Sequence, residues 1–361
     1  MTEEMRRTPL YDSHKALGAR IVPFAGWEMP VSYAGILEEA RAVRTAVGLF
    51  DISHMGRLIV QGGSALDLLQ RTTTNDVASL SPGQAQYSLI PNPQGGIVDD
   101  IIVYRNAADS FTIVLNASNT AKDIAWFKAH APASVTFTDF TESTAMIAVQ
   151  GPSAPRLVSQ LAGQDLSGVP RFSFVEGRIG GARAGLCRTG YTGEDGFEVI
   201  VDAPDARTVW ELLVREGGIP CGLGARDALR IEAGYPLYGH EIDDTTTPVE
   251  AALMWVVKLD KVDFVGRDVI AKTKAEGAGR KLVGLTLQER IIPRQGYTLY
   301  RGSEAVGTVT SGIFSPSTGH SIGMAYVADP HNKPGTSVEV EIRANRYPAT
   351  VVPKKDLLAR A

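Results

Sequence analysis

Two adjacent aspartates inside an apolar run are the first residues of this sequence that could do chemistry. They lie in GGIVDDIIVY, residues 95–104, as Asp99 and Asp100. Aspartate is depleted in strands, and alternation sends neighbouring side chains to opposite faces. If the strand is buried on both faces, at least one carboxylate must be paired or functional, because an unpaired buried charge is costly. The alternative is that both aspartates cap the adjacent turn.

A glycine-rich segment, RTGYTGEDGFE at residues 188–198, is the second candidate. Gly190, Gly193 and Gly196 recur at every third position, which predicts a shaped loop with backbone positions that need positive φ. The loop would bring Tyr191 and Glu198 to the start of a strand. A polar surface turn is the alternative interpretation.

Two arginines in GLGARDALRIEAG, residues 222–234, share one face of a predicted helix. Arg226 and Arg230 are four residues apart, which is the spacing of neighbours on a helix surface. They could bind an anion, or they could be solvated or salt-bridged.

Other common catalytic patterns do not occur. The six histidines are scattered without metal-ligand spacing, and there is neither a G-x-S-x-G nor a G-x-x-x-x-G-K-[ST] motif. Gly222-Leu223-Gly224 begins like a dinucleotide loop but lacks the third glycine. Cys187 and Cys221 cannot form a disulfide framework, and we expect both to be small buried apolar residues. The sequence therefore argues against metal hydrolysis, P-loop chemistry and a Rossmann cofactor, and it predicts no bound metal.

The elements that would position these residues follow from the hydrophobic pattern. A strand at 56–62 precedes a helix at 65–73, for which Ser64 is a candidate N-cap. Runs at 84–90, 97–104 and 111–115, separated by two turns, predict an antiparallel meander. Ser118 could cap a second helix at 120–131. Further strands are predicted at 135–140, 145–151, 171–177, 182–188 and 196–202, with helices beginning near residue 152 and at 205–218.

The composition changes beyond Lys274. AEGAGR at 275–280 resembles a linker, and only short β runs follow it. That pattern predicts a small separate barrel or sandwich. The chain of 361 residues is too long for one ordinary core, and its order of strands and helices predicts an α+β class with more than one domain.

The balance of charge and hydrophobicity limits the partners. With a net charge of −4 the chain has no general attraction for nucleic acid, although a local basic pocket remains possible. No apolar run approaches the roughly 20 residues that span a bilayer. The N-terminal segment lacks the apolar core of a signal peptide. We therefore expect a cytoplasmic protein that binds neither nucleic acid nor membranes.

Several landmarks together resemble the glycine cleavage system T-protein, or aminomethyltransferase, family. Their order and spacing extend from about residue 8 to about residue 352, which makes the combination specific although no single motif is. The landmarks are TPLYDSH, FAGW, LFDISHMG, TND, GGIVDD, RTGYTGEDGFE, GLGARDALRIEAG, LYG and GMAYV.

The resemblance implies three domains around a central funnel that holds tetrahydrofolate, built from antiparallel sheets with helices and a C-terminal all-β barrel. The implied boundaries are 1–50 with 140–240, then 51–139 with 241–275, then 276–361. It also implies a monomeric enzyme that takes an aminomethyl group from the dihydrolipoyl arm of the H-protein. The products are ammonia, dihydrolipoyl H-protein and 5,10-methylenetetrahydrofolate.

The resemblance also assigns the site. It places the catalytic aspartate at Asp100 and the pterin-binding acid at Glu198, and it lines the folate site with the remaining residues: Met55, Tyr87, Asp99, Tyr191, Arg226 and Tyr238. The chemistry agrees. One carboxylate can accept both the exocyclic amine and a ring N–H of a pterin, aromatic and thioether side chains can contact the ring, and an arginine can bind the anionic glutamate tail. A carboxylate near the folate nitrogens can stabilise positive charge on the transferred carbon, and it could also transfer a proton.

One departure and two rival functions remain. The family often carries an aromatic residue near its C-terminus, whereas this chain ends VVPKKDLLARA. A folate-dependent sulfoniopropionate demethylase shares the architecture and needs no H-protein. A folate-binding factor of iron–sulfur assembly also shares it, and such a factor is expected to carry a reactive cysteine motif, in which neither Cys187 nor Cys221 lies.

Overall fold

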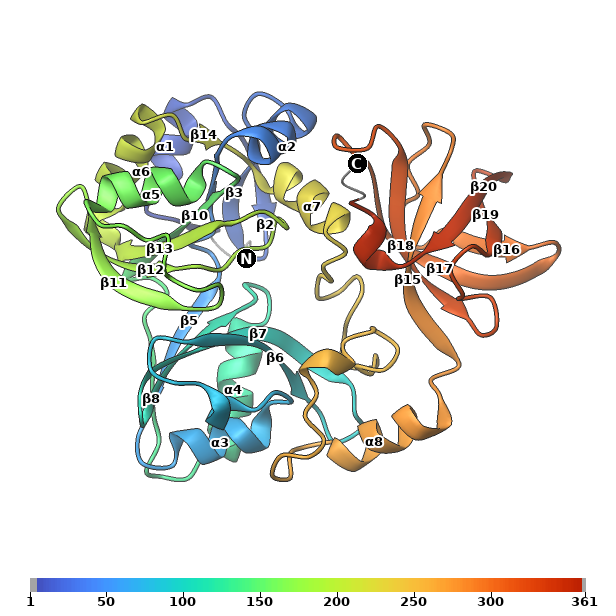
Figure 1. Cartoon of the computed structure of the whole chain (residues 1–361), viewed down its shortest axis with the longest axis horizontal. Helices are drawn as coiled ribbons and strands as arrows, with labels where there is room; N and C mark the ends of the chain where they lie inside the picture. Colours follow the sequence, from blue (N-terminus) through green and yellow to red (C-terminus); the bar gives the residue numbers. More distant parts are fainter. Residues whose placement is uncertain (1–4, 359–361) are drawn as a thin grey trace. The chain divides into compact units, whose positions relative to one another are not determined.

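The computed structural model of the protein describes residues 5–358 (Figure 1). The first four residues of the N-terminal segment and the last three of the C-terminal segment therefore lie outside the described part. Contacts group the chain into two compact units, one of Met1–Ser88 with Asp100–Arg226 and one of Leu89–Asp99 with Asp227–Ala361. Each unit is described by itself below, and the three-domain boundaries stay a prediction. The class is α+β, as the sequence predicted.

A six-stranded sheet forms the larger core of the first unit, in the order β11-β12-β13-β10-β4-β14. Alternation along β13 turns Phe197 and Val199 toward a core that includes Trp210 and Leu157. Helices α5 (Ala154–Ala162) and α6 (Ala206–Arg215) supply these partners and cover one face of the sheet (Figure 1). The strands are β4 (Gly48–Asp51), β10 (Thr144–Gln150), β11 (Phe174–Ile179), β12 (Ala182–Cys187), β13 (Gly196–Asp202) and β14 (Ile219–Pro220).

A five-stranded sheet in the order β6-β7-β8-β5-β9 contains the predicted meander. The strands β6, β7 and β8 are neighbours in chain order, which confirms that prediction, and residues 89–99 at their first turn belong to the second unit. Helices α3 (Ala65–Thr72) and α4 (Thr120–His130) pack on each other beside this sheet (Figure 1). The strands are β5 (Gly56–Gln61), β6 (Ala85–Pro91), β7 (Ile97–Ala107), β8 (Ser110–Leu115) and β9 (Thr136–Asp139).

The N-terminal residues of the first unit add elements that the sequence did not predict. A small sheet has the order β1-β3-β2, with β2 and β3 joined by a tight turn at Ala25 and Gly26, both at positive φ. The elements are β1 (Arg6–Arg7), α1 (Tyr11–Ala16), β2 (Arg20–Phe24), β3 (Trp27–Ser32) and α2 (Ile36–Thr45), and the unit also contains η1 (Val77–Ser79) and η2 (Ala203–Asp205).

A closed six-stranded barrel dominates the second unit, in the order β15-β18-β17-β16-β19-β20. Alternating apolar side chains such as Leu285, Val309 and Val340 fill its interior, which confirms the predicted C-terminal barrel. The strands are β15 (Arg280–Leu287), β16 (Thr298–Arg301), β17 (Glu304–Phe314), β18 (Ser321–Ala328), β19 (Ser337–Ile342) and β20 (Asn345–Val352).

A buried ion pair ties the barrel to the preceding segment of the second unit. Arg230 Nη1 lies 2.7 Å from Glu241 Oε2, and Arg230 Nη2 donates to Ser311 Oγ on β17 at 2.7 Å. Arg230 is thus a structural residue in this unit, which answers the open question about its role. The other elements here are α7 (Leu223–Glu232), whose first residues belong to the first unit, η3 (Met254–Val256), α8 (Arg267–Glu276) and η4 (Lys354–Asp356).

The helix starts predicted at Ala65 and Thr120 are confirmed, whereas the predicted cap at Ser118 and the predicted linker are wrong. Ser64 is the N-cap residue of α3, although its hydroxyl makes no capping hydrogen bond and accepts one from Ser134 instead. The N-cap residue of α4 is Asn119 and not Ser118. The expected linker at 275–280 begins inside a helix, because α8 continues to Glu276. Within residues 5–358 no helix is long and apolar enough to cross a membrane.

Candidate functional site

Asp100 lies at the centre of a hydrogen-bonded group on three consecutive strands. Tyr87 on β6 donates its hydroxyl to Asp100 Oδ2 at 2.9 Å. Asn116, the residue after β8, donates Nδ2 to Asp100 Oδ1 at 2.7 Å and to the Asp100 carbonyl at 3.2 Å. Both carboxylate oxygens are therefore oriented by donors from the strands on either side of β7, while the side chain stays partly exposed.

The two adjacent aspartates differ in environment, as alternation predicts. Asp99 is fully buried and Asp100 is partly exposed. The turn before β7 is closed by Asn92, whose Oδ1 accepts from the backbone N–H groups of Gln94 and Gly96 at 2.9 Å each. The turn thus has its own capping residue, which favours the functional interpretation of Asp100 over the capping one.

Glu198 lies on the face of β13 opposite the apolar core and is only 7% exposed. Its Oε2 accepts a hydrogen bond from Thr189 Oγ1 at 2.5 Å, and Thr189 Oγ1 is 2.9 Å from the Tyr104 hydroxyl. Burial raises the pKa of Glu198, although the Thr189 hydrogen bond and the charge of Arg226 both act to lower it. Glu198 has no ion pair with any described residue, and a buried carboxylate of this kind is typical of a binding site rather than of a structural contact.

Arg226 carries unused hydrogen-bonding capacity. Its guanidinium lies 4.8 Å from the centre of the Tyr191 ring, and Nη2 is 3.7 Å from Met55 Sδ. Among the described residues Nη1 is buried and has no hydrogen-bond partner. Burial lowers the pKa of Arg226, while the charge of Glu198 favours its protonated form. These contacts bring together Arg226, Tyr191 and Met55 near Glu198, and their role in a folate site stays a prediction.

The segment that presents Met55 is held rigidly by a buried arginine. Arg57 donates from Nη1 to the carbonyls of Ser53 at 3.2 Å and Met55 at 2.8 Å, and from Nε to Thr144 Oγ1 at 2.8 Å. Asp51 Oδ1 accepts from the Ser53 backbone N–H at 2.9 Å. Because backbone and side-chain contacts both fix residues 51–57, Met55 has a defined position without a ligand.

His54 is a buried, uncharged neighbour of this group. Burial lowers its pKa to about 4; the charge of Asp51 opposes this shift, and the charges of Arg226 and Arg57 add to it. Its ring packs edge-on against Phe24 with centroids 5.5 Å apart. His54 is therefore a neutral core histidine at physiological pH.

The glycine loop is a packed structure rather than a polar surface turn. A side chain at Gly190 would place its Cβ 2.0 Å from Gln150 Oε1, and one at Gly196 would lie 2.2 Å from a backbone carbonyl of β10. Arg188 donates to Asp195 from Nε at 3.1 Å and from Nη2 at 2.7 Å. The glycines allow the close approach, and the ion pair closes the loop that leads from Tyr191 to Glu198.

The two remaining predicted residues, Tyr238 and Asp99, belong to the second unit. Tyr238 donates its hydroxyl to Asp244 Oδ2 at 2.8 Å. Burial, the Asp244 hydrogen bond and nearby carboxylates that include Asp99 raise the pKa of Tyr238 well above its ordinary value. The tyrosine hydroxyl therefore stays protonated and can donate. The two cysteines are buried, as expected.

Three residues of these groups were missed by the sequence analysis, namely Asn116, Thr189 and Tyr104. Thr189 lies inside the glycine-rich motif, so its place beside Tyr191 was a usable signal. Asn116 directly follows the third strand of the predicted meander, but its contact with Asp100 depends on the strand register, which the pattern does not give. Tyr104 resembles an ordinary core residue in the sequence.

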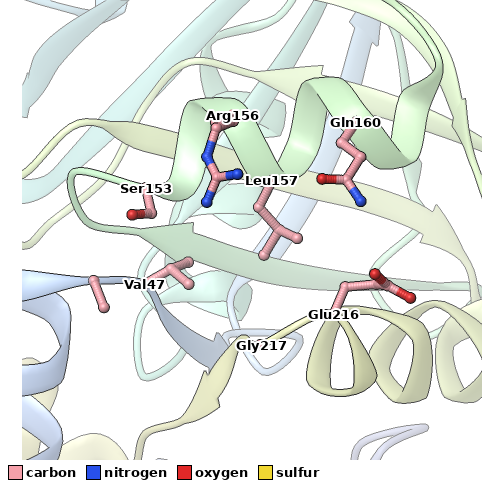
Figure 2. Close-up of a pocket in the computed structure, with 8 residues that line it drawn as sticks. Val47, Ser153, Arg156, Leu157, Gln160, Glu216 and Gly217 are labelled. Carbon is pink, nitrogen blue, oxygen red and sulfur yellow. The ribbon is translucent and has the colours of Figure 1, made fainter.

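A separate hollow of about 310 Å³ lies elsewhere in the first unit. Figure 2 shows Ser153, Arg156, Leu157 and Gln160 along one side of it and Glu216 with Gly217 on the other. Its charged residues are exposed, and none of the eight predicted site residues lines it. The convergent polar groups are thus found around Asp100 and Glu198, not in this hollow.

Comparisons with known proteins find matches over most of the chain. Residues 10–261 match the family described as GCVT N-terminal domain, and residues 280–355 match the glycine cleavage T-protein C-terminal barrel domain. The aminomethyltransferase of Symbiobacterium thermophilum is 48% identical, covering 98% of this chain and 97% of the relative. That of Bacillus subtilis is 45% identical over 96% and 98% of the two chains. The crystal structure of glycine cleavage system aminomethyltransferase T from Bartonella henselae is 34% identical, with a TM-score of 0.92 over 99% of both chains.

Proposed function

Since the chain belongs to the glycine cleavage T-protein family and is an aminomethyltransferase, we propose that Asp100 and Glu198 are the catalytic and pterin-binding acids of its tetrahydrofolate site. The observation that carries the proposal is the pair of oriented carboxylates. Asp100 accepts from Tyr87 and Asn116 and stays partly exposed, and Glu198 is buried near the charge of Arg226 and has no ion pair within residues 5–358.

The polar groups of the first unit fit a reduced folate. Glu198 offers carboxylate oxygens to the neighbouring N–H donors of a pterin. Arg226 has a buried Nη1 that a negatively charged or carbonyl group of the ligand would satisfy. Tyr191 and Met55 present an aromatic ring and a polarizable sulfur to the ring system. Tyr87 completes the set through its contact with Asp100, and Asp99 and Tyr238 are assigned to the same site by the family resemblance.

In the proposed reaction the aminomethyl carbon leaves the dihydrolipoyl sulfur of the H-protein, ammonia is released, and the carbon ends on the folate. Folate supplies the accepting nitrogens when it is bound. Asp100 holds a negative charge beside the transferred carbon, where positive charge develops, and the donors Tyr87 and Asn116 fix its direction. Glu198 and Arg226 hold the acceptor in place, so positioning contributes much of the rate. We place the reaction in the cytoplasm, in a monomeric enzyme.

Ammonia release from aminomethylated, lipoylated H-protein tests this function. The wild-type enzyme should release ammonia and form 5,10-methylenetetrahydrofolate only when tetrahydrofolate and the H-protein are both present. A matched reaction with H-protein that lacks the lipoyl group should give no product. Product formation that does not depend on the lipoyl group would refute the proposal.

The two rival functions make different demands. A demethylase would transfer a methyl group from a sulfonium donor without H-protein, so that donor is the second substrate to assay. An iron–sulfur assembly factor would need a reactive cysteine, whereas burial raises the pKa of both the Cys187 and the Cys221 thiol well above the ordinary value. Such thiols are poor nucleophiles. The names of the relatives also favour aminomethyl transfer.

A further inference from the structure

A chain of hydrogen bonds connects the strand of Asp100 to Glu198. The Tyr104 hydroxyl is 2.9 Å from Thr189 Oγ1, and Thr189 Oγ1 donates to Glu198 Oε2 at 2.5 Å. All three side chains are buried. When Glu198 is ionised its carboxylate can only accept, so the single hydroxyl proton of Thr189 goes to Glu198 and the Tyr104 hydroxyl donates to Thr189. In that state the direction of all these hydrogen bonds is fixed.

Tyr104 connects these hydrogen bonds to the strand that carries Asp100. Tyr104 and Asp100 lie four residues apart on β7, so alternation puts them on the same face, about 13 Å apart along the strand. Thr189 follows β12 and Glu198 lies on β13. The hydrogen bonds thus cross from the five-stranded to the six-stranded sheet of the first unit. An edge-on contact of the Tyr104 ring with Phe174, at a centroid distance of 5.7 Å, holds the tyrosine in place.

We propose that Tyr104 and Thr189 are positioning residues that fix the carboxylate of Glu198 relative to Asp100. The inference rests on the proposed folate site. A glutamate carboxylate has a broad last torsion, so without a partner its plane would be poorly defined. The Thr189 hydroxyl uses one lone pair of Oε2 and leaves the other oxygen, which no described residue contacts through a hydrogen bond, for the ligand. A pterin held by that plane is aligned with the strand that carries Asp100.

We call the hydrogen bonds from Tyr104 through Thr189 to Glu198 the relay. Removing the relay should change folate binding in a way that a purely structural role would not. Thr189→Val removes the donor to Glu198, and Thr189→Ser keeps it. We expect Thr189→Val to weaken tetrahydrofolate binding by about tenfold to a hundredfold, the range of a hydrogen bond to a charged group. We expect Thr189→Ser to stay within about threefold of wild type, and Tyr104→Phe to fall between them, because it acts through Thr189.

The pH dependence of folate binding provides the decisive readout. The titratable groups that face Glu198 are Arg226, Tyr104 and Cys187. Burial raises the pKa of Tyr104 and of Cys187, so both stay neutral. The loss of folate affinity at low pH, here called the acid limb, therefore reports the protonation of Glu198. Thr189 lowers the Glu198 pKa by bonding to its charged form. In Thr189→Val the acid limb should move to higher pH, and in Thr189→Ser it should not move.

Two variants in the barrel are matched controls for lost stability. Tyr326→Phe removes a buried hydroxyl that donates to the Glu241 carbonyl, and Thr310→Val removes one that donates to the Met324 carbonyl. Both should lower the melting temperature and leave the folate affinity and its acid limb unchanged.

Calorimetric titration of the full-length variants with tetrahydrofolate between about pH 5 and pH 8 decides the matter, with Glu198→Ala as reference. The relay is refuted if Thr189→Val lowers only the melting temperature and binds folate like wild type with an unmoved acid limb. That outcome differs from failure of the proposed site, in which Glu198→Ala also binds normally or the wild-type enzyme does not bind folate.

Discussion

Replacing Asp100 by asparagine is the sharpest perturbation of the proposed mechanism. The amide is nearly isosteric, so its Oδ1 can keep the bond from Asn116 Nδ2, which is 2.7 Å in the wild type. The Tyr87 hydroxyl can turn and accept from the new amide nitrogen, because a phenol is both donor and acceptor. The change therefore removes a charge and leaves the local structure in place.

The expected loss follows from Coulomb's law. A unit charge about 4 Å from the transferred carbon, at an effective dielectric constant of about 20, stabilises a developing positive charge by about 4 kcal/mol. Each 1.36 kcal/mol corresponds to tenfold in rate, so the turnover number of Asp100→Asn should fall by about a thousandfold. Folate binding should change little, because Glu198 and Arg226 provide the binding contacts.

The assay is ammonia release from aminomethylated H-protein at saturating tetrahydrofolate, with folate affinity measured separately by calorimetry. Asp109→Asn is the matched control, since Asp109 lies exposed in the β7–β8 hairpin and its replacement makes the same change of charge. An undiminished turnover number in Asp100→Asn would refute the reasoning. So would a loss that arises entirely from weaker folate binding.

Three further predictions concern Asn116, Glu198 and the buried pair of His14 and Asp51, in which His14 Nε2 lies 2.8 Å from Asp51 Oδ2. Asn116→Ala should lower the turnover number about tenfold to a hundredfold in the ammonia assay, because Asp100 loses a donor, and wild-type turnover would remove Asn116 from the site. Glu198→Gln should raise the unfolding free energy of the folate-free enzyme by about 0.5–2 kcal/mol at pH 7.5. Urea titrations should show that this gain shrinks as pH falls, because Glu198 of the wild-type enzyme then becomes protonated. Burial alone would raise the pKa of Asp51, but hydrogen bonds from His14 and other donors lower it to about 2. The stability that ionised Asp51 contributes should be complete above about pH 4 and lost as pH falls toward 2. His14→Leu should lower the unfolding free energy by about 3 kcal/mol at pH 7. An unchanged urea midpoint in that variant would contradict this prediction.

The glutamate prediction depends on the sign of the pKa shift. The pKa of Glu198 is raised in the folded state, so the folded protein binds this proton more readily than the unfolded chain does. Stability then decreases as pH rises through that range, and an uncharged glutamine relieves the cost. A residue whose replacement stabilises the protein while weakening its ligand is typical of a functional site.

Local patterns predicted much of the fold because they depend on neighbours in sequence. Turn residues separated the strands of the meander, and short β runs with glycine indicated the barrel, as β6–β8 and β15–β20 confirm. The N-terminal sheet β1-β3-β2 could not be predicted in this way, because β1 has only two residues and pairs with β3 across the chain. Ser64 is the N-cap residue of α3 as predicted, but its hydroxyl makes no capping bond for a similar reason, since it accepts from Ser134, a partner far away in sequence.

The features of the site that depend on neighbours in sequence were also predictable, and those that depend on distant partners were not. Alternation within one strand was enough to expect different environments for Asp99 and Asp100. The partners of Asp100 were not predictable from the pattern, because the contact with Asn116 depends on the register of β7 against β8. The Tyr104–Thr189–Glu198 chain joins two sheets, which no local pattern reports. The family resemblance supplied the site assignments that local physics left open, and these assignments remain predictions.

A crystal structure of the full-length enzyme with 5-methyltetrahydrofolate would test the central claim most directly. We predict that the Glu198 carboxylate accepts from the pterin amine and the neighbouring ring N–H, and that the Asp100 carboxylate faces N5 with Tyr87 and Asn116 still bonded to it. A folate bound in the hollow beside Arg156, or a pterin that contacts neither Glu198 nor Asp100, would contradict the account.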